Sequence, residues 1–350
     1  MALFRRGTGM TAMTGVLDIT SPRALRDAHL LLVPSTVTVQ DIGELVRARV
    51  RGATMGTTGA VRLGRHSRLL GPFQLTMEDA VDAAVPMPWT VSYAFQAPVE
   101  REDPPPPGVD DRDGFADAFP GGLPWREEGR GLHLLVALAR RLAGAVRVVG
   151  GRLITPDPER AVDIVIHSPF WLEPEVLTKI VTRPLPTARP AVEGEEWEGP
   201  PPEVYSGAVI RQHLPGNPED TSELVALQAL ADEHDLAQLR REEVIDGYAL
   251  IGEVGPYGQD GAVEVLVHLG DPEEPSVAGQ GWASGPFVTY EVRWSCPEPD
   301  ERERRTPSES YLAARERVRP VVSDVARTVV EAAAGVVTDE DGFWLDRYAL

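Results

Sequence analysis

Cysteine and long apolar segments are what the sequence most clearly lacks. Its 350 residues include one cysteine, Cys296, which cannot form an internal disulfide or a cysteine-rich metal site. Apolar runs such as Leu30–Val33 are far shorter than the about 18 residues needed to span a bilayer. The segment from Met1 to Asp18 carries two arginines but no apolar stretch behind them, unlike a secretory signal. These absences predict a soluble cytoplasmic protein without a membrane partner.

Lysine and asparagine are also nearly missing. Lys179 is the only lysine beside 33 arginines, and Asn217 is the only asparagine. This usage is typical of a bacterial, GC-rich coding sequence, so the abundance of arginine by itself says little about function. It also leaves one position for a Schiff-base or phosphate-binding lysine.

The net charge of −20 is distributed unevenly along the chain. Residues 1–70 contain ten arginines and four acidic residues, a balance of +6, whereas the remaining 24 basic and 50 acidic residues give −26. An acidic field of this size repels phosphate backbones and anionic lipids. We therefore predict that the protein has no nucleic-acid partner.

The common chemical motifs are absent from the sequence. It contains neither a P-loop nor a GxGxxG fingerprint that follows a strand and opens a helix. The seven histidines form no HxH or HExxH pattern, and no GxSxG nucleophile elbow occurs. The sequence thus predicts no cofactor and no metal site, and it favours a protein that is not an enzyme.

Two segments rich in proline and acidic residues divide the chain. Residues 98–124 include four consecutive prolines and read as a long loop, expected to be poorly packed. Residues 184–203 read as an acidic, proline-rich linker. We therefore predict an N-terminal α+β domain over residues 1–183 and a C-terminal α+β domain over residues 204–350.

A weak internal repeat suggests that the two domains are related. Residues 140–155 aligned without gaps to residues 331–346 give four identities, at 143/334, 144/335, 146/337 and 151/342. In each half, a strand with an aromatic residue is followed by a loop, a helix, a glycine cap and a hairpin. We predict the helices at 132–143 and from Pro320 to Gly335. The order predicts a tandem pair of ferredoxin-like units, each an antiparallel sheet with helices on one face.

Two groups of residues stand out as candidates for binding a ligand or a partner. On the predicted helix 132–143, His133 and Arg140 share the face away from the apolar stripe, and Trp125 and Arg126 precede that helix. The second group is His167, Phe170 and Trp171, where a strand runs into a proline and two adjacent aromatic residues. A surface histidine and a packing tryptophan explain the first group more simply, whereas closing a core and anchoring an interface explain the second equally well.

Three classes of function remain open. The absence of catalytic motifs favours a binding or protein-interaction module that takes an unknown protein partner or a small ligand. A small-molecule enzyme with scattered histidine and carboxylate residues is the first alternative, and a structural or assembly component is the second. The residues around the deepest pocket discriminate among these classes.

Overall fold

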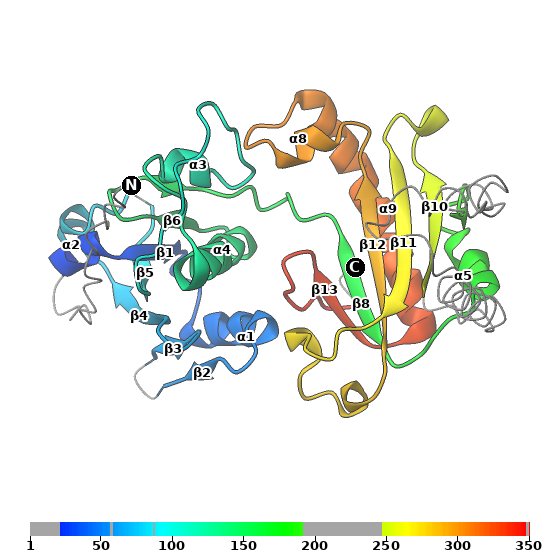
Figure 1. Cartoon of the computed structure of the whole chain (residues 1–350), viewed down its shortest axis with the longest axis horizontal. Helices are drawn as coiled ribbons and strands as arrows, with labels where there is room; N and C mark the ends of the chain where they lie inside the picture. The colour runs from blue at the N-terminus through cyan, green and yellow to red at the C-terminus, as the bar shows by residue number, and fades with distance from the viewer. Residues whose placement is uncertain (1–21, 57–58, 87, 192–246, 348–349) are drawn as a thin grey trace, which may run out of the picture.

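The computed structural model describes residues 22–56, 59–86, 88–191, 247–347 and 350. The chain is an α+β protein with two antiparallel sheets that lie beside each other (Figure 1). We call the elements from β1 to β7 the first unit and those from β8 to β13 the second unit. Among the described helices, none combines the length and the apolar composition required to cross a membrane.

The first unit contains seven strands and four α-helices among its described residues. Its elements are η1 (Pro22–Asp27), β1 (His29–Val33), α1 (Val39–Arg49), β2 (Thr54–Met55), β3 (Val61–Arg62), β4 (Arg68–Gln74), α2 (Met77–Asp82), β5 (Val91–Gln96), α3 (Phe115–Ala118), α4 (Arg126–Arg141), β6 (Ala145–Arg147) and β7 (Leu153–Ile154). Capping boxes at Thr38 and Thr76 start α1 and α2, because each threonine hydroxyl accepts from a backbone N–H of the first turn.

The described part of the second unit contains six strands, and α9 is the longest helix there. Its elements are β8 (Ile164–Ser168), α5 (Pro174–Val181), β9 (Arg189–Pro190), β10 (Gly247–Glu253), η2 (Pro256–Gly258), β11 (Ala262–Leu269), η3 (Pro275–Val277), η4 (Gly281–Ser284), β12 (Val288–Ser295), α8 (Pro299–Glu303), α9 (Glu309–Ala333) and β13 (Val336–Asp339). The predicted helix start at Pro320 is wrong, since Ser308 caps α9 and Pro320 lies inside the helix.

The two sheets share one strand order. The first sheet runs β2-β3-β4-β5-β1-β6-β7 and the second runs β13-β8-β12-β11-β10-β9. The series β4-β5-β1-β6 in the first unit therefore corresponds to β11-β12-β8-β13 in the second. In chain order, a helix follows the first of the four strands in each unit, α1 after β1 and α5 after β8. The longest described helix then connects the third strand to the fourth, as α4 connects β5 to β6 and α9 connects β12 to β13.

The pairing register is equivalent as well. Leu32 pairs with Ser92 on one side and Ala145 on the other, as His167 pairs with Thr289 and Val336. Ala145 and Val336 are also aligned with each other by the sequence repeat.

The glycine after each long helix has the same structural role. A Cβ at Gly144 would lie 2.2 Å from the Leu32 carbonyl oxygen, and one at Gly335 would lie 2.1 Å from that of His167. Only a residue without a side chain allows the helix end to approach the central strand this closely.

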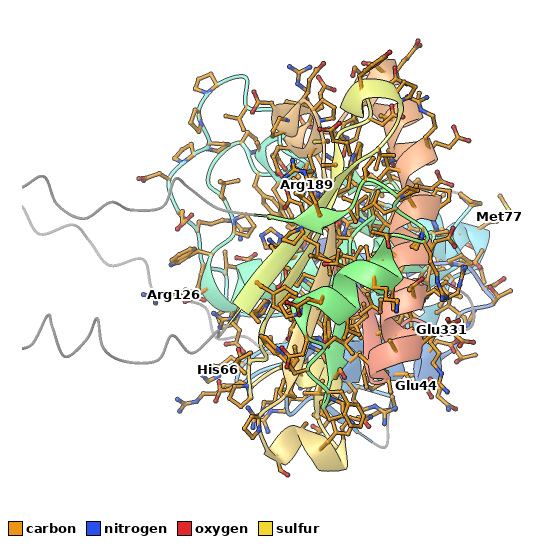
Figure 2. The ribbon with its side chains drawn as sticks, turned by 90° about the vertical axis from the view of Figure 1, so that its right-hand side faces the viewer. Glu44, His66, Met77, Arg126, Arg189 and Glu331 are labelled. Carbon is orange, nitrogen blue, oxygen red and sulfur yellow. The ribbon has the colours of Figure 1, made fainter. Side chains whose placement is uncertain are left out.

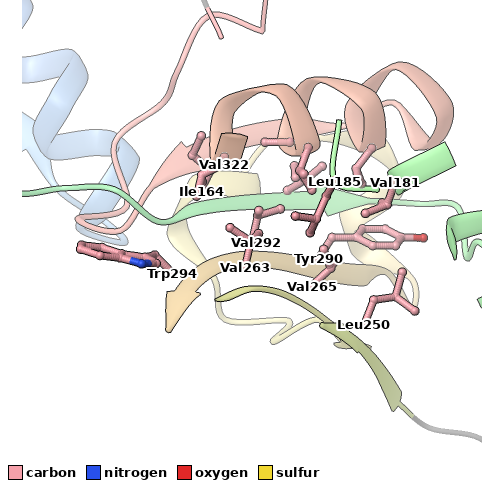
Figure 3. Close-up of a cluster of buried hydrophobic side chains, with 14 of the residues drawn as sticks. Ile164, Val181, Leu185, Leu250, Val263, Val265, Tyr290, Val292, Trp294 and Val322 are labelled. Carbon is pink, nitrogen blue, oxygen red and sulfur yellow. The ribbon is translucent and has the colours of Figure 1, made fainter. Parts of the chain in front are cut away.

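Apolar side chains from the sheets and helices form the cores. In the second unit, α5 and α9 cover one face of the sheet, where Tyr290, Val292 and Val322 are fully buried (Figure 3). In the first unit, α1 and α4 cover one face around Leu31 and Tyr93, while η1 and α2 cover the other. Burying these faces is the main force that holds each unit together.

The boundary between the sheets differs from the predicted domain boundary. Strand β8 pairs with β12 and β13, so the second sheet begins at Ile164, upstream of position 183. Strand β9, inside the predicted 184–203 linker, also pairs with β10 of this sheet. The rest of that linker, residues 192–203, lies outside the described residues. The chain passes from the first sheet to the second at residues 155–163, a short connection. The prediction placed the boundary at 184–203 because that longer segment is rich in proline.

The expectation that loop 98–124 is poorly packed is wrong for residues 111–123, whereas residues 101–110, with the four consecutive prolines, are almost all exposed. Phe115 and Phe119 are buried in the first core, and the Asp111 carboxylate accepts from the backbone N–H groups of Phe115 and Ala116. Other acidic residues of the loop pair with arginines, as Asp113 does with Arg140. The acidic side chains do not repel one another here because arginines brought by the fold neutralise them.

Candidate functional site

A hairpin of the second unit extends into the first unit. After β13 the chain turns at Asp339–Gly342, where Gly342 adopts φ +79° and Asp339 N–H donates to the Phe343 carbonyl at 3.0 Å. Phe343 is fully buried among the apolar side chains of the first core. The turn is thereby held against α1 and α4, and its acidic side chains face the first unit.

Arg140 joins the two units through ion pairs. Its guanidinium contacts Asp113 at 2.6 Å and also pairs with Asp341, while Arg49 Nη1 lies 3.4 Å from Asp341 Oδ1. Arg140 is only 4% exposed. Burial would lower its pKa, but the carboxylates of Asp341, Asp113 and Glu340 together outweigh burial and raise it. Arg140 is therefore charged, and the turn depends on it for neutralisation.

A second set of charges lies beside the first. Glu340 pairs with Arg112 of the first unit and with Arg302 at 3.0 Å, and Arg302 also pairs with Asp163. Burial raises the pKa of Asp163 although Arg302 opposes this. Both units thus contribute to one network of partly buried ion pairs.

A pocket of about 350 Å³ opens beside this network. Its charged lining is Arg140, Arg141, Asp163, Arg319, Asp339 and Asp341, from α4, the start of β8, α9 and the hairpin. The pocket therefore takes its walls from both units, and three positive groups face three carboxylates. Its volume is in the range of small-molecule sites.

Asp339 has the most perturbed carboxyl group in the pocket. It is 9% exposed, and Oδ1 accepts from the N–H groups of Asp341 at 3.0 Å and Phe343 at 2.9 Å. Burial raises its pKa to about 6, although the Phe343 N–H acts in the opposite direction. The ionised carboxylate is therefore incompletely compensated, a condition common at functional sites.

The first group of sequence candidates does not form one site. Trp125 is the N-cap of α4 and Arg126 lies at the surface (Figure 2), about 22 Å along the helix from Arg140. His133 lies against Phe115 with ring centroids 4.5 Å apart. The interpretation of Arg140 as an exposed residue is wrong, because the second unit covers that face of α4. Of this group, only Arg140 lines the pocket.

The second group is also separated from the pocket. His167 is buried on β8, where Nδ1 lies 3.2 Å from Thr289 Oγ1 and the ring meets Phe287 edge-on. Burial lowers the pKa of His167. Phe170 is exposed, and Trp171 packs edge-on against Tyr248. Packing in the second unit accounts for His167 and Trp171.

The acidic residues of the turn were missed as site residues, although the sequence repeat contains a signal for them. The alignment places Val148-Val149-Gly150 of the first unit opposite Asp339-Glu340-Asp341 of the second. The hairpins are equivalent, since Val148 N–H donates to Arg152 O at 2.9 Å as Asp339 does to Phe343. Three carboxylates in one copy of the same turn, with none in the other, indicate a role beyond forming the turn.

A buried pair in the first unit was missed as well. His29 Nδ1 accepts from Val149 N–H at 3.2 Å, which leaves Nε2 to donate to Glu128 Oε1 at 3.1 Å. Glu128 also pairs with Arg101 and accepts from the Glu100 N–H. All these groups have partners, so the pair ties loop 98–124 and α4 to β1 and leaves no atom for a ligand.

Searches with this chain give no relatives. It matches no family model, no curated protein and no solved structure. Within the part of the chain that the structure describes, no three histidine, cysteine or acidic side chains are grouped as a metal site. The pocket between the units is therefore judged on its own geometry.

Proposed function

We propose that the protein is a small-molecule-binding module that encloses its ligand between two ferredoxin-like units. The observation that carries this proposal is the 350 Å³ pocket walled by both units, with the Asp339 carboxylate, whose pKa burial raises to about 6, in its lining. A buried charged group without a full set of partners is destabilising unless something compensates it. A bound ligand supplies that compensation.

The tandem arrangement supports the proposal. The equal strand order and register favour duplication of one ferredoxin-like unit, and the pocket lies where the copies meet. Interfaces between units are common positions for ligand sites, because residues of both sides converge there. The acidic character of residues 71–350 supports a small ligand and disfavours a nucleic acid.

Filling the pocket is expected to abolish binding. Ala161 lines the pocket and is half-buried, so Ala161→Trp places an indole in the ligand volume. The measurement is the thermal shift of the full chain with a panel of amino acids, amines, organic acids, sugars and nucleotides at millimolar concentration. We expect one class to stabilise the unmodified protein and to have no effect on the variant.

The matched control is Ala278→Trp, which adds the same ring at an exposed position outside the pocket. It should keep the thermal shift of the unmodified protein. If no compound of the panel stabilises the protein, or if Ala161→Trp responds equally, the proposed function is wrong.

A further inference from the structure

Asp339 has one oxygen to offer a ligand. Its Oδ1 is engaged by two backbone N–H groups, whereas no donor of the described residues reaches Oδ2 within hydrogen-bond distance. The other carboxylates of the pocket are engaged through both oxygens, Asp341 by Arg49 and Arg140 and Asp163 by Arg302 and Trp294 N–H. Asp339 Oδ2 is thus the carboxylate oxygen of the pocket left for a cation, while Arg141 is a neighbouring positive charge that acts to lower the pKa of Asp339.

Two arginines of the pocket lining have N–H donors left for a negatively charged group of a ligand. Arg141 makes a single weak contact, from Nη2 to the Trp344 carbonyl at 3.5 Å. Arg319 donates to the Glu159 carbonyl and lies 3.9 Å from the Glu159 carboxylate. Both guanidinium groups line the pocket with donors to spare, since each carries five N–H groups. Both can donate to an anionic group of a ligand, although Arg141 is exposed to solvent.

Most charges of the lining are already paired. Arg140 pairs with Asp113 and Asp341, and Asp163 pairs with Arg302, so Asp339, Arg141 and Arg319 are the lining charges with bonding capacity left for a ligand. Only a ligand with one group of each sign satisfies Asp339 and the two arginines together. The Ser323 hydroxyl, also in the lining, adds a neutral hydrogen-bonding group.

We propose that the ligand is a small zwitterion of amino-acid size, with its ammonium group on Asp339 and its carboxylate on Arg141 and Arg319. This inference rests on the proposed function and names the chemical class of the ligand. The complementarity is electrostatic at both ends, so removing either charged group from the ligand leaves a partly buried charge of the protein unpaired.

The first test compares three versions of one molecule. Each of the twenty free amino acids is titrated into the full chain by calorimetry at pH 7.5. For each amino acid that binds, two analogues are then titrated: the amine that lacks the carboxylate and the acid that lacks the amino group. We expect the amino acid to bind at least about tenfold more tightly than either, because each loses a charge-assisted contact.

The outcomes separate this inference from the proposed function. If the amine or the acid binds as tightly as the amino acid, the zwitterion is wrong. The zwitterion is also wrong if the only compounds that bind belong to another class of the panel. If Ala161→Trp abolishes the binding of those compounds, the proposed function as a small-molecule-binding module still stands. If nothing binds, both are wrong.

The second test uses opposite effects of one substitution. Asp339→Asn keeps a side-chain oxygen for the two backbone N–H groups but removes the charge. We expect the affinity for the amino acid to fall at least about tenfold at pH 7.5, while the Tm of the free protein rises by roughly 3 °C. If the Asp339 carboxylate had only a structural role, its replacement would not both lower the affinity for the ligand and raise the Tm of the free protein.

The rise in Tm has a defined pH window. Burial raises the pKa of Asp339 in the folded state to about 6 from an ordinary value of 3.8, so ionisation above pH 6 opposes folding. The gain from asparagine is fully present above pH 6 and disappears as the pH falls below about 4, where Asp339 is protonated in both states. The charged groups that line the pocket with Asp339 are Arg140, Arg141, Asp163, Arg319 and Asp341.

Binding should follow the same ionisation. Between pH 7.5 and pH 5 the affinity of the unmodified protein is expected to fall about tenfold, as a group with a pKa of about 6 becomes protonated. Asp324→Asn is the control, since Asp324 lies on the exposed side of α9 outside the pocket. It should change neither affinity nor Tm. An Asp339→Asn variant with unchanged affinity would overturn the inference.

Discussion

Replacing Arg140 by alanine is expected to lower the free energy of unfolding by about 3 kcal/mol. Arg140 is 4% exposed and neutralises carboxylates of both units, Asp113 and Asp341. Without it, Asp341 keeps Arg49, but Asp113 has no other ion-pair partner among the described residues. The penalty is therefore mainly that of carboxylates left in a partly buried position without a counter-charge. Denaturant unfolding of the full chain measures it.

A double substitution identifies the cause of this loss. Arg140→Ala with Asp113→Ala should be destabilised by at least about 1 kcal/mol less than the sum of the single variants, since the orphaned carboxylate is then absent. Arg126→Ala on the same helix is the control, because its side chain is exposed and lies 3.7 Å from Glu100. It should change stability by about 0.5 kcal/mol or less. Additive losses in the double variant would show that the orphaned Asp113 carboxylate is not the cause of the loss.

Phe343→Ala is expected to have an equally large effect, about 3–5 kcal/mol of unfolding free energy. Phe343 belongs to the second unit by sequence, but its ring is fully buried in the first core, with the Arg49 guanidinium 5.8 Å from its centroid. Truncation leaves a cavity in the first core and removes the apolar contact that holds the acidic turn in place. Denaturant unfolding followed by tryptophan fluorescence measures the loss.

Phe170→Ala is the matched control for this prediction. It removes the same ring from the second unit at a position that is 59% exposed. The expected loss is about 0.5 kcal/mol or less. Equal losses in the two variants would mean that Phe343 does not fasten the units to each other.

Local sequence patterns predicted many of the secondary elements. The predicted helix at 132–143 corresponds to α4, and the one from Pro320 to Gly335 corresponds to part of α9. The hairpins were predicted because glycine marks their turns, as at Gly151 and Gly342. The wrong prediction of a helix start also has a local cause. Pro320 read as a helix start, but a proline on the exposed side of a long helix is tolerated when packing holds both flanks.

The candidate site was predicted only in part. Arg140 was chosen for its place on the helix face away from the apolar stripe, yet it was expected to be exposed. A helical wheel shows which side chains share a face but not what covers that face. Trp125 and His133 share the helix with Arg140 and lie away from the pocket.

The sequence by itself determined the α+β class, the weak repeat and the glycines that end each long helix, because these depend on periodicity and backbone conformation within a few residues. Only the tertiary structure decided where the sheets divide and which charges meet. Asp113, Arg140 and Asp341 are separated by 27 and 201 positions, and burying Phe343 in the other unit brings them together. The pocket and the raised pKa of Asp339 follow from that burial, which no local pattern specifies.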